Sequence, residues 1–144
     1  MAHVPYPGHG MFLPYLINKA TTVLNVRLQK VLDLRGLTLT QWRVLAFLTS
    51  QDGLTISALA EATMTEQSTL SRSLRAMEEL GYVHRKASEV DNRAVHVYLD
   101  RKGLEAFDDI LNRALTIEAE SLRGVSQQEV EQVRSVLLRI IGNC

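Results

Sequence analysis

The sequence of 144 residues contains one cysteine, three prolines and no long apolar run. The cysteine is Cys144, which cannot form an internal disulfide, so we expect a protein of the reducing cytoplasm. No apolar stretch approaches the roughly 18 residues that a membrane-spanning helix needs. The N-terminus lacks the basic region and apolar stretch of a secretory signal, and none is expected.

The chain also lacks the signatures of common enzyme classes. It has no glycine-rich phosphate loop, no nucleophile elbow, and no cluster of cysteine and histidine at metal-ligand spacing. His84 and His96 could face each other across a hairpin, but two ligands are too few for a tetrahedral metal site. We therefore predict that the protein is not an enzyme and uses neither a metal nor a cofactor.

Charge of one sign is not in excess either. The chain carries 16 basic and 16 acidic side chains, which argues mildly against nucleic acid as a partner. Between residues 66 and 102 there are seven basic and six acidic side chains, so any basic surface must come from their arrangement. Hydrophobic residues make up 46% of the chain, enough for one domain with a core over residues 1–144.

Hydrophobic periodicity predicts six helices and one β-hairpin, after an irregular arm of residues 1–10. The expected helices cover residues 12–34, 40–51, 55–62, 66–81, 101–123 and the chain beyond 126. Thr38 or Thr40 would cap the second helix, Asp100 the fifth and Ser126 the sixth. The hairpin is expected to have strands at 82–87 and 94–99 around a tip at 88–93.

This order of elements predicts a mainly α fold with a small β-hairpin wing. A short helix, a tight break, an amphipathic helix and a hairpin are the plan of a winged helix-turn-helix, here over residues 38–100. The helices over 11–36 and 101–144 carry apolar stripes too extensive for that unit to cover. Two-fold pairing is the commonest way to bury such surface, so we expect a homodimer formed by these helices.

The helix over 66–81 has an apolar face on one side and, on the opposite side, a face of small hydroxyls and arginines. Its apolar residues, within about 40° of one another on a helical wheel, are Leu70, Leu74 and Met77. Short side chains allow close approach to the major groove, and Arg72 and Arg75 could reach guanine edges or phosphates. The alternative is a solvated face with an Arg75–Glu79 ion pair, but serine and threonine are middling helix formers that such a face does not need.

The hairpin tip carries Arg93, which could enter the minor groove, where the negative potential attracts arginine. Asp91 could hold its guanidinium by a charge-assisted bond, although the alternative is a surface salt bridge that contributes little. The predicted DNA contacts are Thr55, Ser57, Gln67, Ser68, Thr69, Ser71, Arg72, Arg75, Arg85, Lys86, Asp91 and Arg93.

Three segments resemble the MarR family of bacterial transcription regulators: LTLTQWRVLAFL, ISALAEATMTEQSTLSRSLRAMEELGYVHRKAS and DNRAVHVYLDRKG. The last is similar to the family's wing signature of Asp-x-Arg, a strand ending in Leu, a helix cap and Gly. The resemblance implies a dimeric repressor that reads an inverted repeat of double-stranded DNA. It departs at Asp100, where the family has a threonine cap, and at Thr63, where glycine is common in the wider class. We expect the cap chemistry to survive.

The resemblance also implies control by a small ligand, often an aromatic or phenolic acid. We expect its pocket between the terminal helices and the winged helix, lined by Tyr15, Asn18, Trp42, Arg43 and Phe47. The alternative is that Trp42 and Phe47 are core residues. One branch of the family senses peroxides through a cysteine in the first helix, which here has none. A protein-interaction module without DNA binding is the alternative function, supported by the zero net charge.

Overall fold

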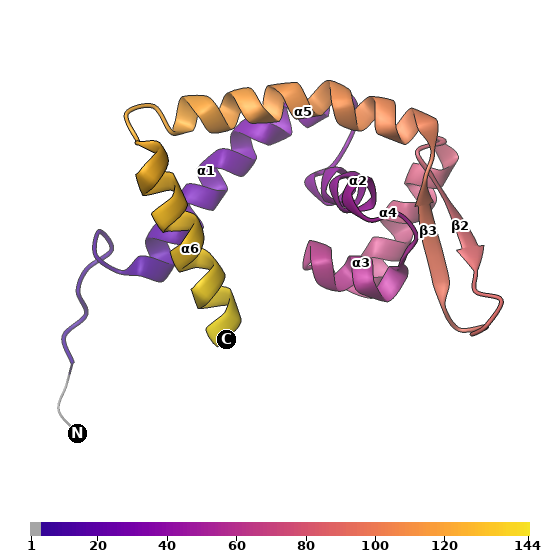
Figure 1. Ribbon diagram of the computed structural model, residues 1–144, viewed down its shortest axis with the longest axis horizontal. Helices are drawn as coiled ribbons and strands as arrows, with labels where there is room; N and C mark the ends of the chain where they lie inside the picture. Colours follow the sequence, from indigo (N-terminus) through magenta and orange to yellow (C-terminus); the bar gives the residue numbers. More distant parts are fainter. Residues whose placement is uncertain (1–3) are drawn as a thin grey trace.

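The computed structural model describes residues 4–144, so the first three residues of the expected arm lie outside the described part. The elements, in chain order, are α1 (Leu13–Asp33), α2 (Leu39–Ser50), β1 (Leu54–Thr55), α3 (Ile56–Thr63), α4 (Gln67–Glu79), β2 (Val83–Ala87), β3 (Val95–Leu99), α5 (Arg101–Ser121) and α6 (Gln127–Asn143). Helix α5 forms the top of an arch, with α1 and α6 on one side and α2 to α4 with the strands on the other (Figure 1). The predicted winged helix-turn-helix is confirmed.

Two of the predicted helix caps form as capping boxes. At the start of α2, the Thr38 hydroxyl accepts from the Gln41 N–H at 3.2 Å, and the Gln41 side chain accepts from the Thr38 N–H at 3.0 Å. Ser126 and Glu129 repeat this arrangement at the start of α6. The backbone N–H and hydroxyl of Ser126 both donate to the Glu129 carboxylate, which lowers the pKa of that carboxyl. These local bonds explain why both helices begin within one residue of the predicted positions.

The third predicted cap does not form. Asp100 precedes α5, but its side chain makes no capping bond. Its Oδ1 instead contacts Nδ1 of His84 on β2 at 2.7 Å, and the His84 ring stacks on Tyr98 at 5.3 Å between centroids. The expectation that the cap chemistry survives at Asp100 is therefore wrong, because the carboxylate is taken by a side chain of the neighbouring strand.

The turn between α3 and α4 is made without glycine. Thr63 stays helical and buried, and its hydroxyl donates to the Leu59 carbonyl at 2.7 Å. Met64 takes the left-handed conformation, with φ of 54°, and its side chain is 81% exposed. The Thr65 N–H then closes the turn on the Ala60 carbonyl at 2.9 Å. The residue at position 63 therefore does not need to be glycine, because the left-handed position is the next one.

The sheet has three antiparallel strands in the order β1–β3–β2, whereas the sequence predicts two. Strand β1 was missed because it has two residues, and Thr55 also caps α3 by accepting from the Ala58 N–H at 3.1 Å. In the hairpin, His84 pairs with Tyr98 and His96 with Lys86. The two histidines are therefore not opposite each other, and His96 Nδ1 bonds the Gly53 carbonyl at 2.8 Å.

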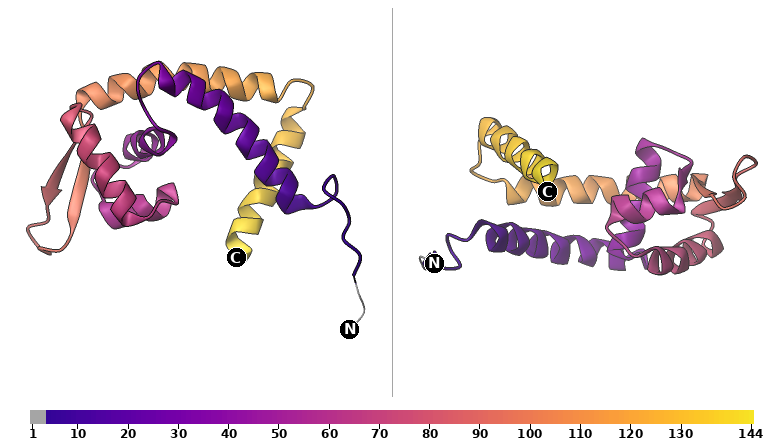
Figure 2. Two further views of the ribbon diagram at one scale, coloured as in Figure 1. Left: turned by 180° about the vertical axis from the view of Figure 1, so that it is seen from behind. Right: turned by 90° about the horizontal axis from the view of Figure 1, so that it is seen from below.

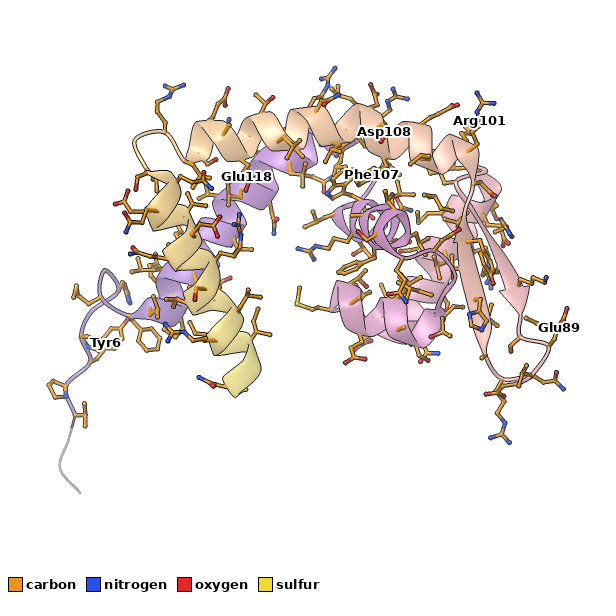
Figure 3. All side chains as sticks on the ribbon, in the orientation of Figure 1. Tyr6, Glu89, Arg101, Phe107, Asp108 and Glu118 are labelled. Atoms are coloured by element: carbon orange, nitrogen blue, oxygen red, sulfur yellow. The ribbon has the colours of Figure 1, made fainter. Side chains whose placement is uncertain are left out.

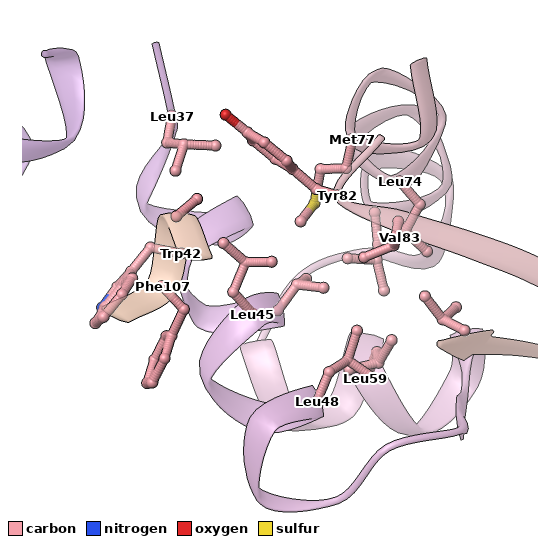
Figure 4. Close-up of a cluster of buried hydrophobic side chains, with 14 of the residues drawn as sticks. Leu37, Trp42, Leu45, Leu48, Leu59, Leu74, Met77, Tyr82, Val83 and Phe107 are labelled. Carbon is pink, nitrogen blue, oxygen red and sulfur yellow. The ribbon is translucent and has the colours of Figure 1, made fainter. Parts of the chain in front are cut away.

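A single hydrophobic core lies where α2, α3, α4 and the sheet meet (Figure 4). Its fully buried side chains include Leu45, Leu48, Leu59, Leu70, Leu74, Met77, Val83 and Val97. Helix α5 joins this core through Phe107, whose ring stacks on Trp42 with centroids 4.8 Å apart and planes 16° apart. The core therefore fixes the start of α5 to the winged helix.

The start of α5 also lies unusually close to the chain that leads into β2. A Cβ atom added to Gly103 would lie 2.2 Å from the Tyr82 carbonyl oxygen and 2.9 Å from Cδ1 of Leu99. The Asp100 N–H donates to the same Tyr82 oxygen at 3.0 Å. Only a residue without a side chain fits at position 103, and α5 follows β3 with one residue between them.

Helices α1 and α5 pack against each other (Figure 2). The ion pair Arg27–Glu120 joins them, and Arg35, just after α1, pairs with Asp109 of α5. Within α1 only Leu32 is buried, and no residue of α6 is buried. Large apolar side chains exposed on these three helices include Val23, Val26, Leu115, Val133, Leu138 and Ile141. No helix within residues 4–144 is long and apolar enough to cross a membrane.

Candidate nucleic-acid interface

Helix α4 has the two faces that the sequence predicts. Leu70, Leu74 and Met77 are fully buried. Side chains on the opposite face are exposed, namely Ser68, Thr69, Arg72, Arg75 and Glu79. Among the described residues, Arg75 and Glu79 form no ion pair, whereas Nη2 of Arg72 lies 3.5 Å from the Thr69 hydroxyl. The exposed face therefore presents small hydroxyls and two arginines.

Five of the predicted contact residues surround one hollow of about 310 Å³. They come from the start of α3, the start of α4 and the wing, and are Thr55, Ser57, Gln67, Asp91 and Arg93. The hydroxyl of Thr55 is held by its capping bond to α3. Folding thus brings together side chains from three separate parts of the chain, and all five are polar or charged.

The wing tip is braced through its backbone. Asp91 Oδ1 accepts from the Arg93 N–H at 3.0 Å, and the Ser88 hydroxyl accepts from the N–H groups of Val90 and Asp91 at 3.2 Å. The expectation that Asp91 holds the Arg93 guanidinium is therefore wrong, because an aspartate two residues before a turn N–H reaches that N–H first. The Arg93 side chain is exposed beyond this turn.

Arg85 binds a carboxylate of α4, which sequence reasoning did not anticipate. Glu78 Oε2 accepts from Nε and Nη2 of Arg85 at 3.0 and 2.8 Å, and Oε1 accepts from the Arg85 N–H at 3.0 Å. The side-chain bond from Arg85 is the main cause that lowers the pKa of Glu78. Lys86, the next residue, is exposed. The sequence does contain a signal for this pair. An acid at the end of a helix, Glu78, is followed by a glycine turn at Gly81 and by an arginine on the next strand, Arg85.

The five predicted ligand residues are not gathered in one pocket within residues 4–144. Trp42 is buried against Phe107, so its alternative interpretation as a core residue is confirmed. Phe47 is 38% exposed and is not core, Arg43 is half-buried, and the exposed Tyr15 ring packs against His9 of the arm. Asn18 lines a hollow of about 550 Å³ between the start of α1 and the end of α6.

Comparison with known proteins identifies the family. A sequence model of the MarR family matches residues 35–94. The organic hydroperoxide resistance transcriptional regulator of Bacillus subtilis is 26% identical over 132 residues, which cover 90% of this chain and 86% of that protein.

Solved structures extend this similarity to the whole chain. A MarR-family regulator from Silicibacter pomeroyi matches with a TM-score of 0.89 and 29% identity, over 99% of this chain and 96% of that one. The transcriptional regulator PA3341 is 31% identical, with a TM-score of 0.83, over 92% of this chain and 97% of that one. With its winged helix and the arginine face of α4, the chain belongs to the MarR family of DNA-binding transcription regulators.

Proposed function

We propose that this regulator is a homodimeric repressor that binds an inverted repeat of double-stranded DNA and is released by a small aromatic or anionic ligand. The observation that carries the proposal is the convergence of Thr55, Ser57, Gln67, Asp91 and Arg93 around one hollow beside the exposed arginine face of α4. The hydroxyl, amide and guanidinium groups among its lining residues are donors that suit a sugar–phosphate segment between the wing and the start of α4.

In this proposal α4 is the recognition helix and lies in the major groove. The hydroxyls of Ser68, Thr69 and Ser71 allow close approach, and Arg72 donates to O6 and N7 of a guanine. Arg75 and Lys86 contact phosphates, and Arg93 enters the minor groove. Arg85 is occupied by Glu78, so we assign it to positioning rather than to DNA. Staphylococcus aureus MepR, 22% identical with a TM-score of 0.79, has the same fold and is solved bound to DNA.

The proposed dimer uses the helices over 11–36 and 101–144, and residues 38–100 form the DNA-binding part. Helix α6 supports this division because none of its residues is buried in the single chain. Val133, Leu137 and Ile141 form an exposed apolar stripe on it. Pairing two such chains would place two recognition helices about one DNA turn apart, which matches a palindromic site.

The proposed ligand is supported by two solved structures of the same fold. CouR of Rhodococcus jostii RHA1 is solved with p-coumaroyl-CoA, and BpsR of Bordetella bronchiseptica has DNA binding regulated by 6-hydroxynicotinic acid. Both are 20% identical to this chain, so they support only that the fold accepts aromatic ligands. The hollow beside Asn18 is a candidate position, and a panel of aromatic carboxylates added to the DNA complex tests for release.

The experiment that tests DNA reading is selection of bound duplexes from a randomised pool at two salt concentrations. An enriched inverted repeat with half-sites about one helical turn apart supports the dimeric reader. No enrichment at low salt would instead support the alternative function, a protein-interaction module that does not bind DNA. The nearly balanced charge of residues 66–102 is the observation that favours this alternative. The two are separable because phosphate contacts weaken steeply as salt rises.

Arg72→Ala is expected to weaken binding to the selected site by about 1–3 kcal/mol and to relax the preference at one base pair, since a bidentate guanine contact is lost. Fluorescence anisotropy on the selected site and on single-base variants measures both effects. Arg101→Ala is the matched control, because Arg101 points away from the wing tip at the top of the arch (Figure 3) and pairs only with Glu105 among the described residues. An equal loss on selected and random duplexes would contradict base reading by Arg72.

Arg93→Ala is expected to weaken binding to all duplexes about equally and to reduce the slope of log K against log salt by about 1, because one cationic contact disappears. Titrations at four salt concentrations measure the slope. Arg101→Ala again serves as control, and its slope should match that of the unmodified protein. An unchanged slope for Arg93→Ala would place Arg93 outside the DNA interface.

A further inference from the structure

We propose that Glu78 and Arg85 form a latch that positions the wing against the recognition helix, so that both are positioning residues for DNA binding. Glu78 lies in the last turn of α4, and Arg85 is the third residue of β2. Neither side chain touches the DNA in this inference. It rests on the proposed function, because it takes Arg93 to be a DNA contact.

The latch holds the strand by its backbone as well as by its side chain. β2 is an edge strand of the sheet. Every second residue therefore points its backbone N–H away from β3, where no strand provides an acceptor for the hydrogen bond. Glu78 supplies one, since Oε1 accepts from the Arg85 N–H at 3.0 Å while Oε2 accepts from the guanidinium at 2.8 and 3.0 Å. Three bonds to one carboxylate fix both the distance and the tilt of β2 relative to α4.

Within residues 4–144 this is the one ion pair that joins α4 to the wing. The other ion pair of β2, between His84 and Asp100, leads to the start of α5. The latch therefore connects the two elements that the proposal brings to opposite grooves of the DNA. The hydrogen bonds from Arg85 lower the pKa of the Glu78 carboxyl below its ordinary value, so they favour the ionised form.

Small movements at Arg85 become large at the wing tip. A strand rises by about 3.3 Å per residue, so the tip lies on the order of 15 Å beyond Arg85. A tilt of about 10° at the latch would move the tip by about 3 Å, which is more than a hydrogen bond tolerates. Arg93 can therefore reach a fixed place in the minor groove only while the tilt of the hairpin is held.

The same pair contributes little to folding. The side chains of Arg85 and Glu78 are 29% and 35% exposed, and ion pairs of such exposure stabilise proteins weakly. Leu74, Met77 and Val83, from the same two elements, belong to the hydrophobic core, which includes neither side chain of the pair. Loss of the latch should therefore change where the wing tip lies far more than it changes whether the domain folds.

A double-mutant cycle tests the inference in the full-length protein on the selected duplex. Arg93→Ala is made in the unmodified protein and in the Glu78→Gln variant, and the fold loss in affinity is compared. We expect a loss of about tenfold in the unmodified protein, falling to about twofold or less in Glu78→Gln, because the contact is already misplaced. Arg85→Lys keeps the charge but loses the bidentate geometry, and should behave like Glu78→Gln.

Glu79→Gln is the matched control, since Glu79 is the exposed neighbour of Glu78 and makes no side-chain bond within the described part of the chain. In that background the loss from Arg93→Ala should remain about tenfold. A partly unfolded variant would weaken all duplexes alike and leave this factor unchanged, so the factor reports position and not folding. Thermal unfolding of each variant checks the folded fraction directly.

The outcomes separate this inference from the proposed function. A loss from Arg93→Ala that stays the same in Glu78→Gln overturns the latch and leaves the wing contact standing. No loss from Arg93→Ala in the unmodified protein overturns the wing contact, and the latch with it. A factor that also collapses in Glu79→Gln would show a general charge effect and would equally count against the latch.

Discussion

Val133→Glu is expected to turn a dimer into monomers and to weaken binding to a two-half-site duplex by about 100-fold or more. Val133 is 57% exposed on α6 in the single chain, so glutamate has room there and the monomer fold should survive. A second copy covering the same stripe would bury the carboxylate without a partner, which costs several kcal/mol. Sedimentation over a concentration series measures the assembly, and titration with one-site and two-site duplexes measures the avidity.

Gln132→Glu is the matched control for this prediction. Gln132 is the exposed neighbour of Val133 and lies off the apolar stripe, so it gains the same charge without entering the proposed interface. We expect this variant to remain dimeric. A Val133→Glu protein that sediments like the unmodified dimer would exclude this face of α6 from the interface, and an unmodified protein that is monomeric would exclude the homodimer.

Gly103→Ala is expected to lower the free energy of unfolding by about 3 kcal/mol. The new methyl would lie 2.2 Å from the Tyr82 oxygen, a backbone atom that already accepts from the Asp100 N–H. Relief requires α5 to move away from the start of β2, which would also separate Phe107 from Trp42. Urea denaturation followed by circular dichroism gives the change in midpoint at constant slope.

Gly142→Ala is the control that separates the effect of the steric clash at position 103 from the general effect of alanine on helix stability. Gly142 lies in the last turn of α6, and a Cβ there meets nothing within 4 Å in the single chain. Gly142→Ala should therefore leave stability unchanged or raise it by up to about 1 kcal/mol, since alanine is the better helix former. Equal midpoints for Gly103→Ala and the unmodified protein would mean that α5 does not approach β2 this closely.

Several parts of the fold follow from short-range rules and were predictable. The capping boxes at Thr38 and Ser126 lie within four residues, as do the apolar spacings of α4. Such signals depend on backbone geometry that every helix shares, so the sequence predicts the helices and the hairpin to within a few residues.

Bonds between separate elements were not predictable in the same way. Asp100 fits a capping position by local rules, yet it binds His84, which lies sixteen residues earlier. Strand β1 is too short for a periodic pattern, and it exists because β3 has a free edge to pair with. In both cases a hydrogen-bonding partner from another element decides the structure, and local sequence rules do not include that partner.

The sequence by itself determined the order of the elements, the buried face of α4 and the identity of its exposed arginines, because side-chain periodicity depends only on the local helix. Tertiary structure alone decided which polar residues share a site. It placed Thr55, Gln67 and Arg93 around one hollow, and it paired the Arg85 guanidinium with the Glu78 carboxylate. The partners in both cases come from different elements, and which elements meet depends on how the whole core packs, which no local spacing encodes.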